Sequence, residues 1–357
     1  MRVLQIIPIL GTGGAEKFTI DLSNELARLG HEVILVTLFD KSKISTLEVY
    51  VDTKKVKRES LHKKQGFDPK CFISILNLIR KEKPNVVHAH VGAIKYMALA
   101  ATIYRDCKYV ATIHSEAKRE AGKGIEVLTR KYMFKLGLMS PVTISEESEL
   151  SFEKFYGFRG TMIPNGCSSY VANTLDLSIY RKGVDFLFVH AGRLQRVKNQ
   201  ITMVKAFKRL LDEGIRARLL IMGRMEDPEV YNSIKPYFSD NIQYIGEQKD
   251  CRAFMNIADA FCLSSSMEGM PITVIEALSV GCVPIVTPVG GCLNIVKDGN
   301  NGFVAKSIRI DDYYIVLGKF VHLTLVEREE VKRCAIDTYN KMYSIQMSAR
   351  KYLNLYV

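Results

Sequence analysis

Strand and helix patterns alternate along the whole of this sequence. In the first unit, the apolar run at residues 3–7 predicts a buried strand, a glycine turn follows, and a helix then places Phe18, Leu22 and Leu26 on one face. The Val and Ile runs are continuous rather than alternating with polar residues, which indicates parallel strands covered on both faces. Further strands are predicted in the same way at residues 33–37, 85–90, 108–114, 141–145 and 160–164.

The pattern restarts after residues 164–182, a polar segment that lacks periodicity. The sequence therefore predicts two doubly wound α/β domains, residues 1–167 and 168–341, with ligands at the carboxyl ends of the strands, in the cleft between the domains. The strands of the second domain are predicted at residues 185–192, 218–223, 241–246, 259–265, 283–287 and 302–306.

Composition excludes several classes of protein. Apolar residues make up 47% of the 357 and charged residues 25%, as in ordinary globular proteins and unlike disordered chains, collagen or coiled coils. The eight cysteines form no C-x-x-C pair, which argues against a zinc site or a disulfide framework and favours the reducing cytoplasm. No apolar run reaches the ~18 residues of a transmembrane helix, and the N-terminal run reads as a strand rather than a signal peptide.

The net charge of +12 is concentrated in the first half of the chain, where residues 41–83 hold 12 basic and 5 acidic residues. This segment begins with an irregular stretch, 41–65, for which we expect a hairpin or loops. The excess of basic residues forms either an ordinary solvated surface or a site for an anionic partner, namely a phosphorylated substrate, a membrane surface or nucleic acid. Nucleic acid ranks last because the chain has no Trp and no RNA-binding motif.

Three motifs carry candidate chemistry, and the first is the turn Gly11–Gly14 between the first strand and its helix. Its glycines let backbone amides approach a phosphate at a helix N-terminus, although a turn of this kind can also bind nothing. A dinucleotide fingerprint would need a third glycine where Glu16 stands, so an NAD site is disfavoured.

The second motif, at residues 192–199, joins a strand to a helix in the second domain. Arg193 and Lys198 are five residues apart in this loop, so both side chains can point into one crevice. Two cations placed together suit a diphosphate, with each charge-assisted bond worth about 1.5–3 kcal/mol. As isolated surface charges they would be unremarkable.

The third motif, at residues 264–278, is the most specific. Pro271 suits the first position of a helix, which leaves Glu268 in the preceding loop and Glu276 about 8 Å along the helix axis. The two carboxylates can then contact separate parts of one ligand; otherwise they are a helix-entry charge and a solvated helix residue. Between them lie residues whose backbone amides can bind a phosphate, Gly269, Met270, Ile272 and Thr273.

Together these motifs resemble the family-four retaining glycosyltransferases of GT-B fold. The resemblance covers nearly the whole chain and rests on the E-x7-E pair, GRLQRVKN, GTGGAE and VGGCLNIVKDGNNGFV. It implies two Rossmann-like domains facing across a cleft, with the acceptor bound mainly by the first and a nucleotide-sugar donor mainly by the second. It also implies that a helix at about 342–357 packs back on the first domain.

The resemblance also assigns roles to single residues. Glu268 would contact the hydroxyls of the donor sugar and Glu276 the ribose. Arg193 and Lys198 would hold the diphosphate, which Gly13 and Gly14 would approach from the other domain. His114, at the end of a strand, would lie near the sugar and the reaction centre. The loop at Gln248 would meet the base through its backbone.

The chain departs from the family pattern in two places. Gly223–Glu226 replaces a small glycine-acid turn, and Cys292 follows the later glycine pair; we expect neither to affect the main charged residues. Two aspartates never stand two apart, so the metal-binding D-x-D of other glycosyltransferases is missing. We therefore expect a metal-independent reaction without a cofactor, and we interpret His88 and His90 as structural rather than as a metal pair.

The expected activity is sugar transfer with retention to a saccharide or lipid-linked saccharide, with UDP as the nucleotide that the family uses most often. Surface-glycan or capsular polysaccharide synthesis is the expected setting, in the cytoplasm or on the inner face of the membrane. One alternative is a nucleotide-sugar 2-epimerase of the same architecture. A non-catalytic subunit would have lost the charged residues, and a glycoside hydrolase needs two carboxylates at one bond.

Overall fold

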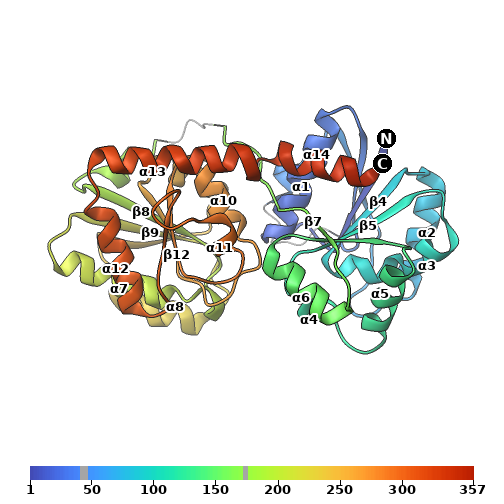
Figure 1. The fold of residues 1–357 in the computed structure, drawn as a ribbon, viewed down its shortest axis with the longest axis horizontal. Coiled ribbons are helices and arrows are strands. Elements are labelled where there is room, and N and C mark those ends of the chain that lie inside the picture. The colour runs from blue at the N-terminus through green and yellow to red at the C-terminus, as the bar shows by residue number, and fades with distance from the viewer. Residues whose placement is uncertain (41–46, 172–175) are drawn as a thin grey trace. The chain divides into compact units, whose positions relative to one another are not determined.

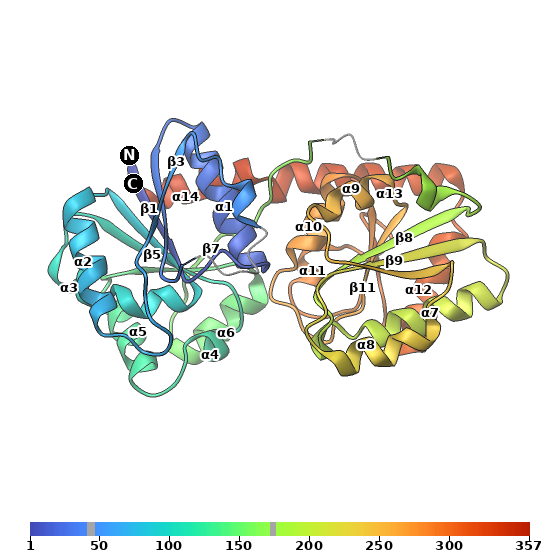
Figure 2. The same ribbon diagram turned by 180° about the vertical axis from the view of Figure 1, so that it is seen from behind.

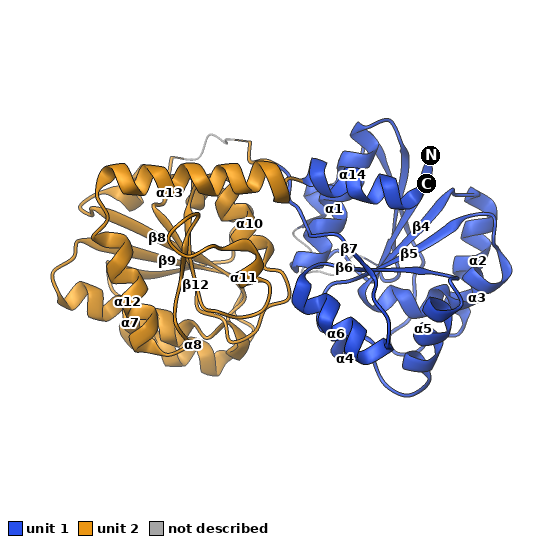
Figure 3. Cartoon of the chain, in the orientation of Figure 1, with its two compact units in different colours: residues 1–168, 345–357 blue, residues 169–344 orange. Residues whose placement is uncertain are grey.

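The computed structural model describes residues 1–40, 47–171 and 176–357. The chain forms two compact units, residues 1–168 with 345–357, and residues 169–344 (Figure 3). Each unit is a parallel sheet with helices on both faces, as Figures 1 and 2 show from opposite sides. The predicted α/β class is confirmed, and every segment predicted to be a strand contains one.

The first unit is built on a seven-stranded sheet in the order β3-β2-β1-β4-β5-β6-β7, with all pairs parallel. The order in which strands are added to the sheet reverses between β1 and β4. In doubly wound folds, ligands bind at such a reversal, outside the carboxyl ends of the strands. The strands are β1 (Arg2–Ile7), β2 (Glu32–Thr37), β3 (Val56–Ser60), β4 (Val86–His90), β5 (Lys108–Ile113), β6 (Ser140–Thr143) and β7 (Thr161–Met162).

Helices cover both faces of this sheet. On one face, Leu4 and Ile6 of the first strand share a core with Ile75, Met133 and Phe152 of three helices. On the other face, the first and last helices of the chain pack against each other. The helices are α1 (Gly14–Arg28), α2 (Lys70–Glu82), α3 (Ala98–Ile103), α4 (Ala117–Glu120), α5 (Ile125–Lys135), α6 (Glu146–Tyr156) and α14 (Ile345–Tyr356), with 3-10 turns η1 (Leu47–Tyr50) and η2 (Val91–Met97).

The basic stretch 41–65 differs from the expectation of a hairpin or loops. It contains η1 and the edge strand β3, which pairs parallel to β2 from Val56 to Ser60. A hairpin would have required antiparallel pairing. Residues 41–46 of this stretch lie outside the described part of the chain.

The second unit has a six-stranded parallel sheet in the order β10-β9-β8-β11-β12-β13. Its strands are β8 (Phe186–Ala191), β9 (Ala217–Met222), β10 (Ile242–Gly246), β11 (Ala260–Leu263), β12 (Val283–Val286) and β13 (Phe303–Val304). Its helices are α7 (Gln200–Asp212), α8 (Pro228–Ile234), α9 (Cys251–Ile257), α10 (Ile272–Ser279), α11 (Cys292–Ile295), α12 (Ile310–Val321) and α13 (Leu325–Thr338), with shorter turns η3 (Ser178–Arg181), η4 (Arg196–Lys198), η5 (Lys235–Tyr237) and the π-helix η6 (Tyr339–Tyr343).

The structure also describes the cysteines and the apolar character of the helices. All eight cysteines are free thiols, five of them buried, and they pack as small apolar groups. Among the described helices, none combines the length and the apolar character needed to cross a bilayer.

Candidate functional site

The loop after β8 carries Arg193 at the carboxyl edge of the second sheet. Its Nη1 lies 3.1 Å from Oε1 of Glu226, in the loop after β9. Burial raises the pKa of Glu226, but hydrogen bonds and charge from Arg224 and Arg193 outweigh it, and the net pKa is lowered. The carboxylate is therefore ionised at neutral pH. The expectation that the departure at Gly223–Glu226 leaves the main charged residues untouched is wrong, because Glu226 is the ion-pair partner of Arg193.

A glycine brings these two loops together. Gly223 has a φ of +142°, and a Cβ on it would lie 2.0 Å from the carbonyl oxygen of Gly192. Only glycine permits this conformation and this approach without a shift of the backbone. The contact fixes the backbone next to Arg193.

Lys198 pairs with Glu268 across 70 positions of sequence. Its Nζ lies 2.7 Å from Oε1 of Glu268, and Ser265 Oγ donates to the same oxygen at 2.6 Å. The glutamate side chain is 9% exposed and the lysine 20%, so water screens the pair only partly. The structure thus brings the motif at residues 192–199 into contact with the motif at residues 264–278.

Hydrogen bonds to backbone carbonyls hold the same loops in place. The amide of Ser266 donates to the carbonyl of Val197 at 2.8 Å, and Ser264 Oγ donates to the carbonyl of Asn199 at 2.9 Å. On the other side, the amide of Gly291 donates to the carbonyl of Gly269 at 2.8 Å. The later glycine pair is therefore part of the support for the Glu268 loop.

Helix α10 begins at Ile272, one residue later than expected, because Pro271 has extended backbone angles and acts as the N-cap without a side-chain cap. The amides of the first turn, at Ile272 and Thr273, follow directly from the Glu268 loop. Glu276 is 8% exposed inside this helix, which rules out the solvated reading. Burial first and then the charge of Glu276 raise the pKa of the thiol of Cys251, the first residue of α9.

Gln248 lies in the loop after β10, two strands away from β8 in the sheet order. Its amide nitrogen donates to the carbonyl of Ile245 at 2.7 Å, which ties the side chain to its own loop.

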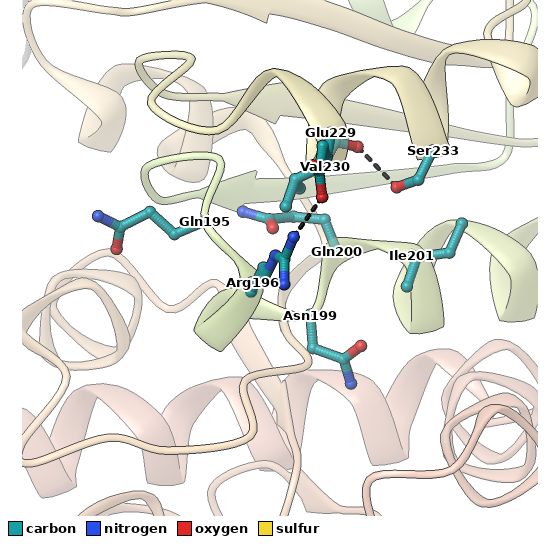
Figure 4. Close-up of a pocket in the computed structure, with 8 residues that line it drawn as sticks. All are labelled: Gln195, Arg196, Asn199, Gln200, Ile201, Glu229, Val230 and Ser233. Atoms are coloured by element: carbon teal, nitrogen blue, oxygen red, sulfur yellow. Dashed lines mark hydrogen bonds and ion pairs between the residues drawn. The ribbon is translucent and has the colours of Figure 1, made fainter.

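A separate pocket of about 250 Å³ lies between the start of α7 and α8 (Figure 4). Arg196 and Glu229 form an ion pair across it, and the amide oxygen of the fully buried Gln200 has no hydrogen-bond partner in the described structure. None of the site residues expected from the sequence lines it. Its lining is Gln195, Arg196, Asn199, Gln200, Ile201, Glu229, Val230 and Ser233.

In the first unit, Gly13 is the N-cap of α1 and Gly14 its first, exposed residue. The Glu16 side chain folds back over this turn, so that a Cβ on Gly13 would lie 2.4 Å from its Oε2. Glu16 thus lies at the turn that the sequence had suggested for a phosphate. An anion at these amides would need this carboxylate to rotate away, since like charges repel.

His114 follows β5 and is partly buried. Its backbone amide donates to Oε2 of Glu120 at 2.8 Å, a carboxylate that sequence reasoning missed because it lies in a helix of four residues. Burial lowers the pKa of His114 to about 3, so the ring is neutral at physiological pH. Its Nε2 contacts Nδ1 of His90 at 3.0 Å.

His88 and His90 have hydrogen-bond partners on both ring nitrogens. Those of His88 are Tyr356 and Thr112, and those of His90 are His114 and Gln5. Within the described residues, no group of three or more His, Cys, Asp or Glu side chains is placed to hold a metal ion.

Comparisons with known proteins match glycosyltransferases. The family model "Glycosyltransferase Family 4" matches residues 12–168, and "Glycosyl transferases group 1" matches residues 178–334. The chain is 26% identical over 272 residues to the Escherichia coli UDP-Gal:alpha-D-GlcNAc-diphosphoundecaprenol alpha-1,3-galactosyltransferase, covering 69% of this chain and 68% of that protein. It is 24% identical over 333 residues to a Campylobacter jejuni alpha-1,4-N-acetyl-D-galactosaminyltransferase named for a PP-undecaprenol-linked acceptor, covering 91% and 89%.

Solved structures agree with this class at the level of the fold. A glycosyltransferase from Rickettsia africae matches with a TM-score of 0.82 at 20% identity, covering 99% of this chain and 97% of that one. The Anabaena protein HepE in complex with UDP matches with a TM-score of 0.81 at 16% identity, covering 99% of each chain. Both similarities establish the two Rossmann-like domains of the GT-B fold.

Proposed function

Because the chain belongs to glycosyltransferase family 4, we propose that it transfers a sugar from a UDP-sugar, with retention, to a hydroxyl of a saccharide or lipid-linked saccharide. The reaction needs no metal and serves the synthesis of a surface glycan. The observation that carries this proposal is the Lys198–Glu268 ion pair, which joins the two most specific motifs of the sequence at the carboxyl edge of one sheet.

The charges at this edge support the binding of a diphosphate. An ammonium group has three N–H donors, so Lys198 can keep its bond to Glu268 and still donate to a phosphate oxygen. The guanidinium of Arg193 has five N–H donors, of which one is engaged with Glu226 at 3.1 Å. The amides of Ile272 and Thr273 and the dipole of α10 add further stabilisation of negative charge.

These groups act where charge develops during transfer. The bond between the anomeric carbon and the diphosphate oxygen breaks, and Arg193 and Lys198 stabilise the departing anion. The acceptor hydroxyl attacks from the same face, and its proton passes to the leaving phosphate oxygen. Glu268 binds the sugar hydroxyls and holds the ring for attack, while Glu276 binds the ribose.

The names of two similar proteins support a choice of donor and acceptor. HepE was crystallised with UDP, and the Escherichia coli relative is named for UDP-Gal and a diphosphoundecaprenol acceptor. We extend both classes to this chain, with UDP as the nucleotide and a polyprenyl diphosphate-linked saccharide as the acceptor.

Saturation-transfer NMR with a panel of nucleotide sugars tests the donor. Incubation of the bound donor with and without a polyprenyl diphosphate-linked saccharide then tests the reaction, and the anomeric coupling constant of the product reports retention. Release of nucleotide and an altered free sugar without any acceptor would instead establish the epimerase. Inversion at the anomeric carbon would contradict the mechanism.

A lipid-linked acceptor requires the first unit to reach a membrane, and the surface of α5 suits an anionic one. Four exposed apolar side chains lie along this helix and its C-cap at positions i, i+3, i+7 and i+11, which places them on one face. They are Ile125, Leu128, Tyr132 and Leu136, with exposed fractions between 53% and 76%.

We call this apolar face the α5 surface, and five basic residues besides Arg130 lie on α5 or within seven positions before it in the sequence. At about 1 kcal/mol for each basic residue near an anionic membrane, several of them give reversible attachment. Arg130 of α5 does not take part, because its side chain is buried at 1% exposure and its Nη1 lies 3.8 Å from Oε1 of Glu120. The remaining basic residues near α5 are Lys118, Arg119, Lys123, Lys131 and Lys135.

Co-sedimentation with vesicles tests the α5 surface. The wild-type chain should bind vesicles rich in anionic lipid more than neutral ones, and less as salt rises. Leu128→Glu should reduce this binding, whereas Leu325→Glu, an equally exposed leucine in the second unit, should leave it unchanged. Equal binding to anionic and neutral vesicles would remove the membrane from the proposal and leave a soluble acceptor.

A further inference from the structure

Polar side chains are concentrated on one face of the first sheet, below α1 and α14. Alternation along a strand places Leu4 and Ile6 on the opposite face, in the core with α2, and turns Gln5 toward α14. His88 and His90 on β4 face the same way. The neighbouring strand β5 adds Thr112, so that adjacent strands contribute a row of buried polar groups.

A continuous chain of hydrogen bonds links His114 to the last helix of the sequence. His114 Nε2 contacts His90 Nδ1 at 3.0 Å, and His90 Nε2 contacts Gln5 Oε1 at 2.7 Å. The Gln5 amide nitrogen donates to the hydroxyl of Tyr356 in α14 at 3.3 Å.

The chain continues beyond Tyr356. Its hydroxyl contacts His88 Nδ1 at 2.7 Å, and His88 Nε2 contacts Thr112 Oγ1 at 2.7 Å. Thr112 in turn contacts the hydroxyl of Tyr352, also in α14, at 2.8 Å. The last helix therefore enters the network at two points.

The Gln5 amide determines which atom donates and which accepts in the hydrogen bonds between Gln5, His90 and His114. Burial lowers the pKa of all three histidines, so each neutral ring has one donor and one acceptor nitrogen. The Gln5 oxygen only accepts, so His90 Nε2 carries a proton and His90 Nδ1 accepts. His114 must then donate from Nε2, which leaves its Nδ1 as an unprotonated acceptor.

We propose that Gln5 and Tyr356 are positioning residues that hold His114 as the Nε2–H tautomer and leave Nδ1 as an acceptor for a hydroxyl of the bound substrate. His114 Nδ1 is buried and has no hydrogen-bond partner among the described residues. The inference rests on the proposed function, which places His114 near the reaction centre. It adds that Tyr356 of α14 acts on the ring through Gln5 without touching the substrate.

Nitrogen-15 NMR of the full chain with labelled histidine tests the tautomer directly. The two ring nitrogens of a neutral imidazole have distinct shifts, and His114→Gln assigns the signal. We expect His114 to be protonated at Nε2 in the wild type. In Tyr356→Phe, which removes the acceptor for the Gln5 amide, we expect the ratio of the two tautomers to change about fivefold, the equivalent of one net hydrogen bond. A wild-type ring protonated at Nδ1 overturns the proposal even if Tyr356→Phe does not fold.

Tyr352→Phe is the matched control, because it removes a buried hydroxyl from the same helix but leaves every bond between Gln5 and His114. It should keep the wild-type tautomer, kcat and KM. Tyr356→Phe should lower kcat about two- to fivefold with the donor KM unchanged. Equal losses in both variants would mean that α14 acts only as structural support, and the proposal would be wrong. If the wild type transfers no sugar, the proposed function fails, whereas the NMR measurement still decides the tautomer.

Discussion

The substitution Glu268→Gln separates the binding of the sugar from the binding of the diphosphate. It keeps the shape of the side chain and an oxygen that accepts from Ser265 Oγ, which lies 2.6 Å away in the wild type. It removes the negative charge that faces Lys198 at 2.7 Å. The lysine then carries an uncompensated charge, which favours binding of an anionic diphosphate.

The expected magnitudes follow from these contacts. A charge-assisted hydrogen bond from a sugar hydroxyl to Glu268 contributes about 1.5–3 kcal/mol, so its loss should lower kcat about 10- to 150-fold. The affinity for free UDP should stay the same or increase by up to about tenfold, since one opposing charge is removed from the site. Glu276→Gln is the control, because loss of a ribose contact should weaken UDP itself.

Calorimetry with free UDP and initial rates with the complete donor provide both measurements. Thermal unfolding of each variant shows whether the fold is kept. If Glu268→Gln abolishes UDP binding while Glu276→Gln leaves it intact, the assignment of the two glutamates is reversed. Loss of UDP binding in both variants would show that the glutamates bind one part of the donor and would refute the reasoning.

Four further predictions concern the metal, Lys198, His114 and the glycine contact. Activity should survive EDTA, and Lys198→Ala should lower kcat/KM about 10- to 150-fold; a loss of turnover that Mg²⁺ or Mn²⁺ restores would contradict metal independence. Burial lowers the pKa of His114 to about 3, so between about pH 6.5 and pH 3 the unfolded chain binds a proton at this ring while the folded chain does not. The free energy of unfolding should therefore decrease as the pH is lowered through this range, by about 2 kcal/mol at pH 5. Denaturant titrations of His114→Gln should show a shallower decrease between pH 7 and 5, and an unchanged slope would refute this. Gly223→Ala should lower the free energy of unfolding by about 1–3 kcal/mol more than Gly214→Ala, because both have positive φ but only Gly223 has a backbone oxygen at the Cβ position; equal losses in urea would contradict the close contact.

The sequence by itself determined the elements whose pattern is local. Strands such as β11 and β12 are continuous apolar runs because parallel strands are buried on both faces, and this signal needs no knowledge of the neighbours. The place where α10 begins was found within one residue, because Pro271 restricts its own backbone. The strand β3 was missed because only Val56 of its five residues is buried, so the apolar pattern is lost at the edge of the sheet.

Only the tertiary structure decided which charges meet. Glu226 pairs with Arg193 33 residues away, and nothing in the local pattern distinguishes it from a solvated acid. Arg130 looked like one of several basic surface residues, yet the fold buries it. The hydrogen-bonded row from His114 through Gln5 to Tyr356 joins positions up to 351 residues apart. Such contacts depend on the order of strands in the sheet and on where the last helix packs, which are set by the burial of the whole chain rather than by any one segment.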